Sequence, residues 1–339
     1  MFLHNRWYVA AQSQDLGKTP VAVHILNQPI VLFRITDGSI VALKDRCVHR
    51  QAPLSRGEVF GDIIQCAYHG FCFDRLGNCV RIPSQKKIPP GAHIQNYLVK
   101  EKHGHIFIWM GSQNLSKLEP IYEFPWKEDE NWRVINIKFH APFEYRLLID
   151  NLMDLSHLAY LHQSTIGVDA VAAKATQKTE RKDQRVIVTR LMENIDQAPT
   201  HIEITNFSGK VDRWQRVEFY PPGYFWVQTG SAITGKGANN ADFKDILIKR
   251  NSVHMVVPET EATTNYFYTT VHKTENMTQK QESIFRKRMT QTFIEDIELL
   301  EQISARTDSK YPKIDVAADS GALEAQKVLN SLIGKQRIS

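Results

Sequence analysis

Short apolar runs, separated by turn residues, dominate the first third of the chain and predict β-strands. Ile30–Arg34 and Ile40–Leu43 lie on either side of Asp37-Gly38, and Asp-Gly between two such runs is a strong hairpin signal. A further apolar run, His105–Met110, predicts a last strand before the pattern becomes polar. The first part of the chain is therefore expected to be an all-β domain.

Longer periodic patterns follow and predict helices mixed with strands. Leucines recur at helical spacing within Tyr145–Leu161, and a long helical pattern covers Thr278–Ile303. A last helix is expected at Ala322–Ile333, with Gly334 as its C-terminal stop. The strand-like runs of this part are Arg185–Arg190, Glu218–Gln228, Ser252–Val257 and Thr263–Val271.

These elements predict an α+β protein, in which helices are grouped against antiparallel sheet. A boundary near residues 115–135 divides the chain into domains of residues 1–120 and 121–339. Hydrophobic residues make up 42% and charged residues 23% of the 339 positions, so both domains can bury a core and a disordered or fibrous protein is excluded.

Charge and hydropathy narrow the possible partners. The net charge of +5 is too small to indicate nucleic-acid binding, and the basic run Arg286-Lys287-Arg288 is typical of a solvated helix face. No apolar stretch approaches the roughly 20 residues of a membrane span, and Met1–Trp7 lacks the apolar core of a secretory signal. We expect a cytoplasmic protein whose four cysteines are free thiols or metal ligands.

The densest chemical signal is a pair of Cys-x-x-His-like segments. Cys47-Val48-His49 and Cys66-Ala67-Tyr68-His69 each offer one thiol and one imidazole, which suits two loops that grip a metal from opposite sides. Zinc is one interpretation, because Cys₂His₂ is a common structural zinc set. A Rieske [2Fe–2S] centre, with two Cys on one iron and two His on the other, matches the arrangement better. Cys72 and Cys79 match neither pattern and are predicted to be free thiols.

A second polar cluster lies within the leucine-rich helix. Asn151, Asp154 and His157 are three residues apart and share one helix face, where burial among leucines is costly unless they are paired or bind a metal. His162 is five residues past His157, which on a regular helix turns it about 140° away. Both imidazoles can reach one metal only if the helix loosens or bends after His157.

The long C-terminal helix offers a third ligand. Asp296 stands on the apolar stripe formed with Met289, Phe293 and Leu300, whereas Glu295, Glu298 and Glu301 fall on other faces and are interpreted as solvated. A buried ion pair with an Arg or Lys is the alternative role for Asp296. Two His and one carboxylate form the facial triad of non-haem Fe(II) oxygenases, which leaves positions open for O₂.

Several stretches resemble one known family, the Rieske non-haem iron oxygenases. Asp45–Ser55 with Cys66–Gly70 resembles their Rieske domain, and Asn151–His162 with Phe293–Asp296 is similar to their mononuclear-iron motifs. The likeness is greatest to the vanillate, dicamba and toluenesulfonate group, which shares the opening Asn5–Ala10. The resemblance implies a Rieske domain, a helix-grip catalytic domain and a head-to-tail homotrimer.

The resemblance also implies roles for individual residues. Cys47, His49, Cys66 and His69 would hold the cluster, and His157, His162 and Asp296 the iron. Asp154 would connect His157 to a Rieske histidine of the neighbouring subunit, Asn151 would lie close to the iron, and His254 would contact substrate. From their residue types and positions alone, Trp226 and Gln228 are either pocket residues or ordinary sheet residues.

The implied activity is that of a monooxygenase. Electrons from NADH would arrive through a separate flavin- or ferredoxin-type reductase, and O₂ would be used to hydroxylate or O-demethylate a small aromatic acid. Three alternatives stay open at this point: a ring-hydroxylating oxygenase on another substrate, a Rieske electron-transfer protein with a non-catalytic second domain, and a zinc-stabilised binding protein. An electron carrier needs no facial triad, so the ligand set around Asp296 distinguishes the alternatives.

Overall fold

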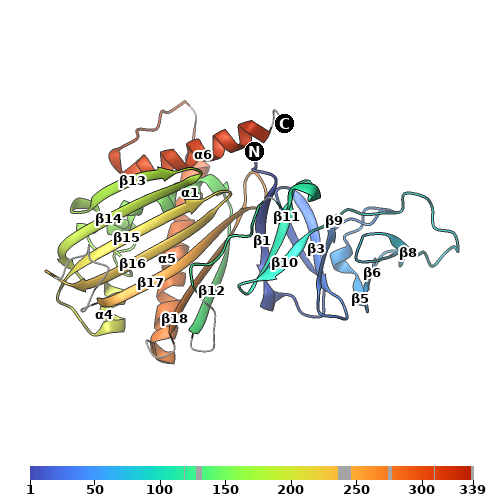
Figure 1. Ribbon diagram of the computed structural model, residues 1–339, viewed down its shortest axis with the longest axis horizontal. Coiled ribbons are helices and arrows are strands. Elements are labelled where there is room, and N and C mark those ends of the chain that lie inside the picture. The colour runs from blue at the N-terminus through green and yellow to red at the C-terminus, as the bar shows by residue number, and fades with distance from the viewer. Residues whose placement is uncertain (118, 127–131, 236–245, 274–276, 309, 337–339) are drawn as a thin grey trace. The chain divides into compact units, whose positions relative to one another are not determined.

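The computed structural model describes residues 1–117, 119–126, 132–235, 246–273, 277–308 and 310–336 (Figure 1). The chain forms two compact units. The first contains Met1–Glu123 together with Val257–Glu261, and the second contains Phe124–Val256 and Ala262–Ser339. The segment Val257–Glu261 was expected in the second domain; its Pro258 and Glu259 carbonyls instead accept hydrogen bonds from the amides of Leu26 and Asn27.

The first unit consists of three small antiparallel sheets. Their strand orders are β1-β11-β10, β2-β3-β4-β9 and β5-β6-β7-β8. The strands are β1 (Arg6–Gln12), β2 (Val21–Ile25), β3 (Gln28–Arg34), β4 (Ile40–Lys44), β5 (Glu58–Phe60), β6 (Ile63–Gln65), β7 (Cys72–Phe73), β8 (Cys79–Arg81), β9 (Asn96–Tyr97), β10 (Val99–Lys102) and β11 (His105–Met110). Short 3₁₀ turns η1 (Ser13–Asp15), η2 (Leu54–Arg56) and η3 (Gln113–Leu115) connect them. This confirms the all-β prediction, and the hairpin across Asp37-Gly38 forms with Arg34 opposite Ile40.

The second unit is a seven-stranded antiparallel sheet with helices, in the order β12-β18-β17-β16-β15-β14-β13 (Figure 1). Its strands are β12 (Trp132–Ala141), β13 (Thr176–Lys182), β14 (Arg185–Asp196), β15 (Lys210–Tyr220), β16 (Tyr224–Ile233), β17 (Ile246–Pro258) and β18 (Thr264–Lys273). Its helices are α1 (Tyr145–Met153), η4 (Leu155–His157), α2 (Leu158–Leu161), α3 (Ala170–Ala173), α4 (Pro199–Thr205), α5 (Gln279–Arg306), η6 (Ala317–Asp319) and α6 (Ser320–Gln336). The α+β prediction is confirmed.

Three predicted elements break or end at places that the sequence analysis did not anticipate. The predicted helix Tyr145–Leu161 is broken at Asp154, whose extended backbone ends α1 and whose carboxylate caps η4. The predicted strand Glu218–Gln228 is two strands, because a turn at residues 221–223 separates β15 from β16. Gly334 does not end the last helix, since α6 continues through it to Gln336.

A capping box at the start of α5 helps to fix the position of this long helix. The Thr278 hydroxyl accepts a hydrogen bond from the Gln281 amide, and the Gln281 side chain accepts one from the Thr278 amide, so two amides at the helix start are satisfied. Farther along, α5 buries Met289, Phe293 and Asp296. The predicted apolar stripe is confirmed, and it turns one carboxylate into the interior of the second unit.

Candidate metal centres and the adjoining cavity

The two Cys/His loops of the first unit have matching backbone geometry. In each loop the Cys amide donates to the carbonyl five residues later, over 2.9 Å from Cys47 and 2.8 Å from Cys66. Each Cys carbonyl accepts from the amide four residues later, where Gln51 and Gly70 have left-handed backbones with φ of 60° and 71°. A glycine adopts this conformation without strain, and a Cβ at Gly70 would also lie 2.9 Å from the Pro83 ring.

The side chains of these loops separate by chemistry. Cys47 and Cys66 are buried in the core of the unit, whereas His49 and His69 are exposed, with ring centroids 4.5 Å apart. Burial, followed by the nearby Cys66 thiol, raises the pKa of Cys47 to about 11. Within the described chain, no three ligand atoms of these residues lie within 4.8 Å of one another. A single zinc ion needs such convergence, so the arrangement fits a larger two-iron cluster with thiolates inside and imidazoles outside.

Cys72 and Cys79, the other two cysteines, are buried and not in disulfides. Cys72 donates a weak hydrogen bond to the Gly70 carbonyl at 3.4 Å. This agrees with the prediction of free thiols.

In the second unit, a break in the helix brings two histidines together. Asp154 leaves the helical backbone, and its carboxylate accepts hydrogen bonds from the Ser156 amide and hydroxyl, each 2.8 Å long. The chain then makes only η4 and one turn of α2, which ends at His162. The helix therefore breaks once before His157 and again at His162. We had expected a single bend after His157. The two rings lie 5.3 Å apart.

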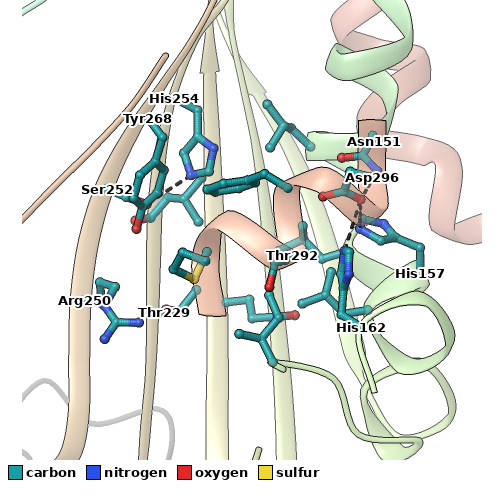
Figure 2. Close-up of a pocket in the computed structure, with 18 of the residues that line it drawn as sticks. Asn151, His157, His162, Thr229, Arg250, Ser252, His254, Tyr268, Thr292 and Asp296 are labelled. Carbon is teal, nitrogen blue, oxygen red and sulfur yellow. Dashed lines mark hydrogen bonds and ion pairs between the residues drawn. The ribbon is translucent and has the colours of Figure 1, made fainter. Parts of the chain in front are cut away.

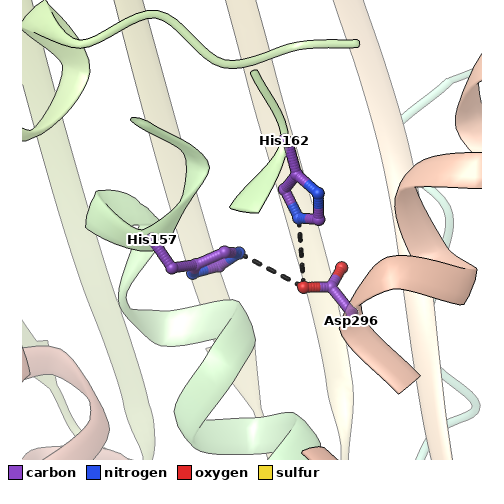
Figure 3. A group of neighbouring side chains, drawn as sticks. All are labelled: His157, His162 and Asp296. Atoms are coloured by element: carbon purple, nitrogen blue, oxygen red, sulfur yellow. Dashed lines mark hydrogen bonds and ion pairs between the residues drawn. The ribbon is translucent and has the colours of Figure 1, made fainter. Parts of the chain in front are cut away.

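Asp296 completes a compact group with these histidines (Figure 3). Its Oδ1 lies 3.1 Å from His162 Nε2 and 3.4 Å from His157 Nε2, and the three ligand atoms all lie within 4.8 Å of one another. Asn151 donates to the same oxygen over 3.0 Å. No Lys or Arg among the described residues forms an ion pair with Asp296, so the buried ion-pair alternative is excluded there.

The other ring nitrogen of each histidine has an oxygen partner. His157 Nδ1 donates to the Asp154 backbone carbonyl over 2.7 Å, and His162 Nδ1 donates to Glu295 Oε2 over 2.8 Å. Both Nε2 atoms therefore face Asp296, and each can bind a metal in the neutral form of its ring. We expected the Asp154 carboxylate to accept from His157, and this was wrong, because that carboxylate caps η4. The interpretation of Glu295 as solvated was also wrong.

The local electrostatics differ between the two rings. Burial lowers the pKa of His157, although the Asp296 charge opposes this. Burial also acts to lower the pKa of His162, but the hydrogen bonds and charges of Asp296 and Glu295 outweigh it and raise the pKa. Two carboxylates, one at each ring nitrogen of His162, favour a positive charge there.

A cavity adjoins this group, between the sheet and α5 (Figure 2). Leu155, Ile166, Val227, Met289 and Phe293 provide its apolar walls. Apolar walls with a few polar groups among them are typical of a site for a small organic molecule.

His254, expected to contact substrate, does line this cavity. Its Nδ1 hydrogen-bonds with the Tyr266 hydroxyl at 2.5 Å and its Nε2 with the Ser252 hydroxyl at 3.1 Å. Burial lowers its pKa to about 3, so the ring is neutral near pH 7. Its role toward substrate stays a prediction.

Trp226 and Gln228 do not line the cavity, which corrects the prediction that they form the pocket. Side chains alternate along a strand, and Val227 and Thr229 face the cavity. Trp226 and Gln228 instead donate to Asn251 Oδ1, over 3.4 Å and 3.2 Å, on the other face of the sheet.

Sequence reasoning missed Arg213 and Arg250, two charged residues in the cavity wall. Each lies on the same face of its strand as apolar residues that point inward; Val217, for example, is four residues after Arg213 on β15. That alternation is the only signal the sequence carried, and it was obscured because Arg216 and Glu218 occupy the opposite face of the same strand.

Comparison with known proteins agrees with this geometry. Residues 6–97 match the Rieske [2Fe-2S] domain, and residues 139–335 match the vanillate O-demethylase oxygenase C-terminal domain. The chain belongs to the Rieske non-haem iron oxygenases. It is an oxygenase component of the monooxygenase and O-demethylase type.

Individual relatives cover nearly the whole of this oxygenase. A putative toluene-4-sulfonate monooxygenase system iron-sulfur subunit of Comamonas testosteroni is 34% identical over 98% of this chain and 97% of its own. A vanillate O-demethylase oxygenase subunit of a Pseudomonas species is 30% identical over 99% and 96%.

Solved structures of dicamba monooxygenase share the fold. The crystal structure with 3,6-dichlorosalicylic acid superposes with a TM-score of 0.92 at 26% identity, covering 100% of this chain and 99% of that one. Another, with non-heme iron and dicamba, gives 0.83 at 25% identity and 99% coverage of both chains. Among the helices described for this oxygenase, none is both long and apolar enough to cross a membrane.

Proposed function

We propose that this oxygenase uses O₂ to hydroxylate or O-demethylate a small aromatic acid, with electrons from NADH delivered by a separate flavin- or ferredoxin-type reductase. The observation that carries the proposal is the convergence of His157, His162 and Asp296 within 4.8 Å at the wall of a largely apolar cavity. An electron-transfer protein or a zinc-stabilised binding protein needs neither this group nor this cavity.

The donor sets suit two different iron centres. Cys47, His49, Cys66 and His69 would hold the [2Fe–2S] cluster in a domain of residues 1–120, and the triad would hold Fe(II) in a domain of residues 121–339. When bound, the cluster transfers single electrons and the iron supplies O₂ activation at the positions that three protein ligands leave open.

The remaining side chains orient the ligands and shape the cavity. The Asp154 carbonyl and the Glu295 carboxylate fix the two imidazoles with Nε2 toward the metal position. The Asn151 amide holds Asp296. The apolar walls exclude water and hold an aromatic ring beside the triad.

We also propose a head-to-tail homotrimer in which the cluster of one subunit supplies electrons to the triad of the next, through Asp154. Large apolar side chains are exposed near both centres: Tyr68 at 65% beside the cluster loops, and Tyr160 at 72% and Ile314 at 86% in the second unit. Such exposure is typical of surfaces that a partner covers. Asp154 and His157 line a second cavity in the same unit, which leaves the Asp154 carboxylate accessible to a partner residue.

We propose a cytoplasmic location, where NADH would be available to the proposed reductase. No nucleic acid or membrane partner is proposed. Relatives of this chain are named as iron-sulfur or oxygenase subunits, and this supports a separate reductase.

The test is a complementation experiment on the purified holoprotein with a Rieske-type reductase. Cys66→Ser should lose the visible cluster spectrum and retain mononuclear iron, whereas Asp296→Ala should do the reverse. Each variant should be inactive in NADH-dependent O₂ uptake with methoxybenzoates or methylbenzenesulfonates. Mixed and reassembled trimers should recover activity, because some neighbouring pairs then contain both intact centres.

Three results would contradict the proposal. Zinc instead of iron and sulfide would exclude the cluster, and O₂ uptake unaffected by Asp296→Ala would exclude the triad. A mass other than three chains by light scattering would exclude the trimer. Formaldehyde release from methoxy substrates separates demethylation from hydroxylation.

A further inference from the structure

Two arginines of the sheet face the cavity where an apolar wall is expected. Strand β15 places Arg213 and Gln215 on its inward face, and β17 places Arg250 there. Gln215 lies opposite Thr229 of β16, and Thr229 lies opposite Arg250. Gln215, Thr229 and Arg250 therefore form one row across three neighbouring strands, with Arg213 two residues before Gln215 on β15.

Arg213 is a buried cation that forms no ion pair with a carboxylate among the described residues. Arg213 is 2% exposed. Its Nη1 donates to the Ile166 carbonyl over 2.9 Å, and its Nε has no hydrogen-bond partner. Burial, and then the charge of another cation, Arg190, lowers the pKa of Arg213 to about 10. Arg190 Nη1 donates to the side-chain oxygen Oε1 of Gln215 over 3.1 Å. The side-chain nitrogen Nε2 of Gln215 is buried and has no hydrogen-bond partner.

Arg250 is half-buried in the same wall. Its guanidinium carbon lies 3.7 Å from the centre of the Phe285 ring, a cation–π contact. Across the described part of the chain, no carboxylate forms an ion pair with Arg213 or Arg250. His201 lies near both arginines, but burial and then their charges push its pKa far down, so it is neutral and can accept or donate only one hydrogen bond per nitrogen.

Among the described residues, the Arg213 Nε and Gln215 Nε2 donors of this wall therefore have no acceptor, and its two cations have no carboxylate partner. Buried charges are normally paired, and guanidinium donors match the geometry of planar and tetrahedral oxyanions. We propose that Arg213, Arg250 and the Gln215 amide form an anion subsite that binds the carboxylate or sulfonate group of the aromatic substrate. This inference rests on the proposed function, and it assigns the acid group a place.

Arg250 and the triad lie at different ends of the cavity. The residues of α5 that line it run from Met289 to Asp296, seven steps or about 10 Å at the helical rise of 1.5 Å per residue. Arg250 packs on Phe285, one turn beyond Met289. Figure 2 shows Arg250 on the sheet side, across from His157, His162 and Asp296. A ring held this way carries its acid group and the group to be oxidised at opposite, para-related positions.

Binding to the holoprotein tests the subsite without turnover. Calorimetry would compare 4-methylbenzoate, 4-methylbenzenesulfonate and the neutral 4-methylbenzamide against wild type, Arg250→Met, Arg213→Met and the control Arg216→Met. Arg216 is on the other face of β15 and pairs with Glu218. Losing one charge-assisted pair of hydrogen bonds should weaken both anions about 10- to 100-fold, with the amide changed less than about 3-fold and the control unchanged.

Each outcome decides. Equal anion affinity in wild type, Arg250→Met and Arg213→Met overturns the subsite, even when O₂ uptake persists. Arginine-dependent anion binding without any O₂ uptake supports the subsite while the proposed function fails. Should a Met variant not fold, Arg250→Lys retains the charge but not the fork, and must still weaken anions relative to the amide. The two anions distinguish a carboxylate from a sulfonate preference, and faster turnover of ortho than para isomers would contradict the placement of the acid group.

Discussion

Glu295 provides the sharpest test of how the iron ligands are oriented. Its carboxylate accepts the His162 Nδ1 proton over 2.8 Å and is itself held by the Gln291 amide over 3.0 Å. The Glu295 side chain is 22% exposed, so solvent screens this interaction only in part. Glu295→Ala removes the acceptor, frees the ring to rotate and allows the proton to move to Nε2, where it blocks metal binding.

The expected magnitude follows from the hydrogen bond. A bond to a charged group contributes about 1.5–3 kcal/mol, which corresponds to roughly a 10- to 100-fold loss of iron affinity. Glu295→Gln should lose less, because the amide oxygen still accepts from Nδ1 and only the charge is removed. Glu298→Ala is the matched control, since Glu298 is on the same helix and exposed.

The assay is an iron titration of protein that holds the cluster but lacks mononuclear iron, against a competing chelator. The visible spectrum of the cluster reports that the first unit is intact, and a thermal melt reports folding of the second. Equal iron affinity in Glu295→Ala and Glu298→Ala would refute the argument that Glu295 fixes His162.

Three further predictions concern other parts of the protein. Asp154→Asn should leave iron affinity within about 3-fold of wild type, because His157 is held by the backbone carbonyl of Asp154 rather than by its carboxylate. Stopped-flow spectra should nevertheless show slow reoxidation of the cluster with substrate and O₂, and normal reoxidation would exclude Asp154 from the electron path. Turnover with the reductase should fall as ionic strength rises, with slower association the cause, since five exposed arginines near the cluster loops would steer an acidic partner; a salt-independent rate would argue against this docking face, formed by Arg46, Arg50, Arg56, Arg75 and Arg81. The free energy of unfolding should decrease as pH falls from 6.5 toward 3, because the pKa of His254 is about 3 when folded and near 6.5 when unfolded, so the unfolded state binds the extra proton. In urea titrations of His254→Gln, the slope of the free energy of unfolding against pH should be shallower by up to about 1.4 kcal/mol per pH unit, and an unchanged slope would mean that His254 is protonated in the folded protein.

The residue types of both candidate metal centres could be read from the sequence because their spacing is local. The two Cys/His segments need only a few residues each, and matching loop hydrogen bonds explain why both present one thiol and one imidazole. Asp296 was recognisable because helical periodicity placed a lone carboxylate on an apolar stripe. Short-range geometry, with 3.6 residues per turn, was sufficient for these predictions.

The partners of the ligands could not be read in this way. Glu295 is adjacent to Asp296 and points about 100° away on the helix, yet it contacts His162 because α2 ends at that residue. The Asp154 carboxylate was expected to hold His157, but the local cap at η4 took it first. Competition between a local hydrogen bond and a distant one depends on where the helix breaks, and apolar periodicity does not report a break.

Only the tertiary structure decided which face of the sheet lines the cavity. A shift of one residue reverses every side chain of a strand, and both faces of β15 and β16 carry polar residues, so alternation in the sequence could not choose between Trp226 and Val227, or between Arg213 and Arg216. The register of four strands, together with the packing of α5 against them, made that choice. For this protein the sequence by itself determined the metal-binding chemistry, because that chemistry depends on local spacing. The cavity depends on which distant strands pair, and that is settled by burial of the whole second unit.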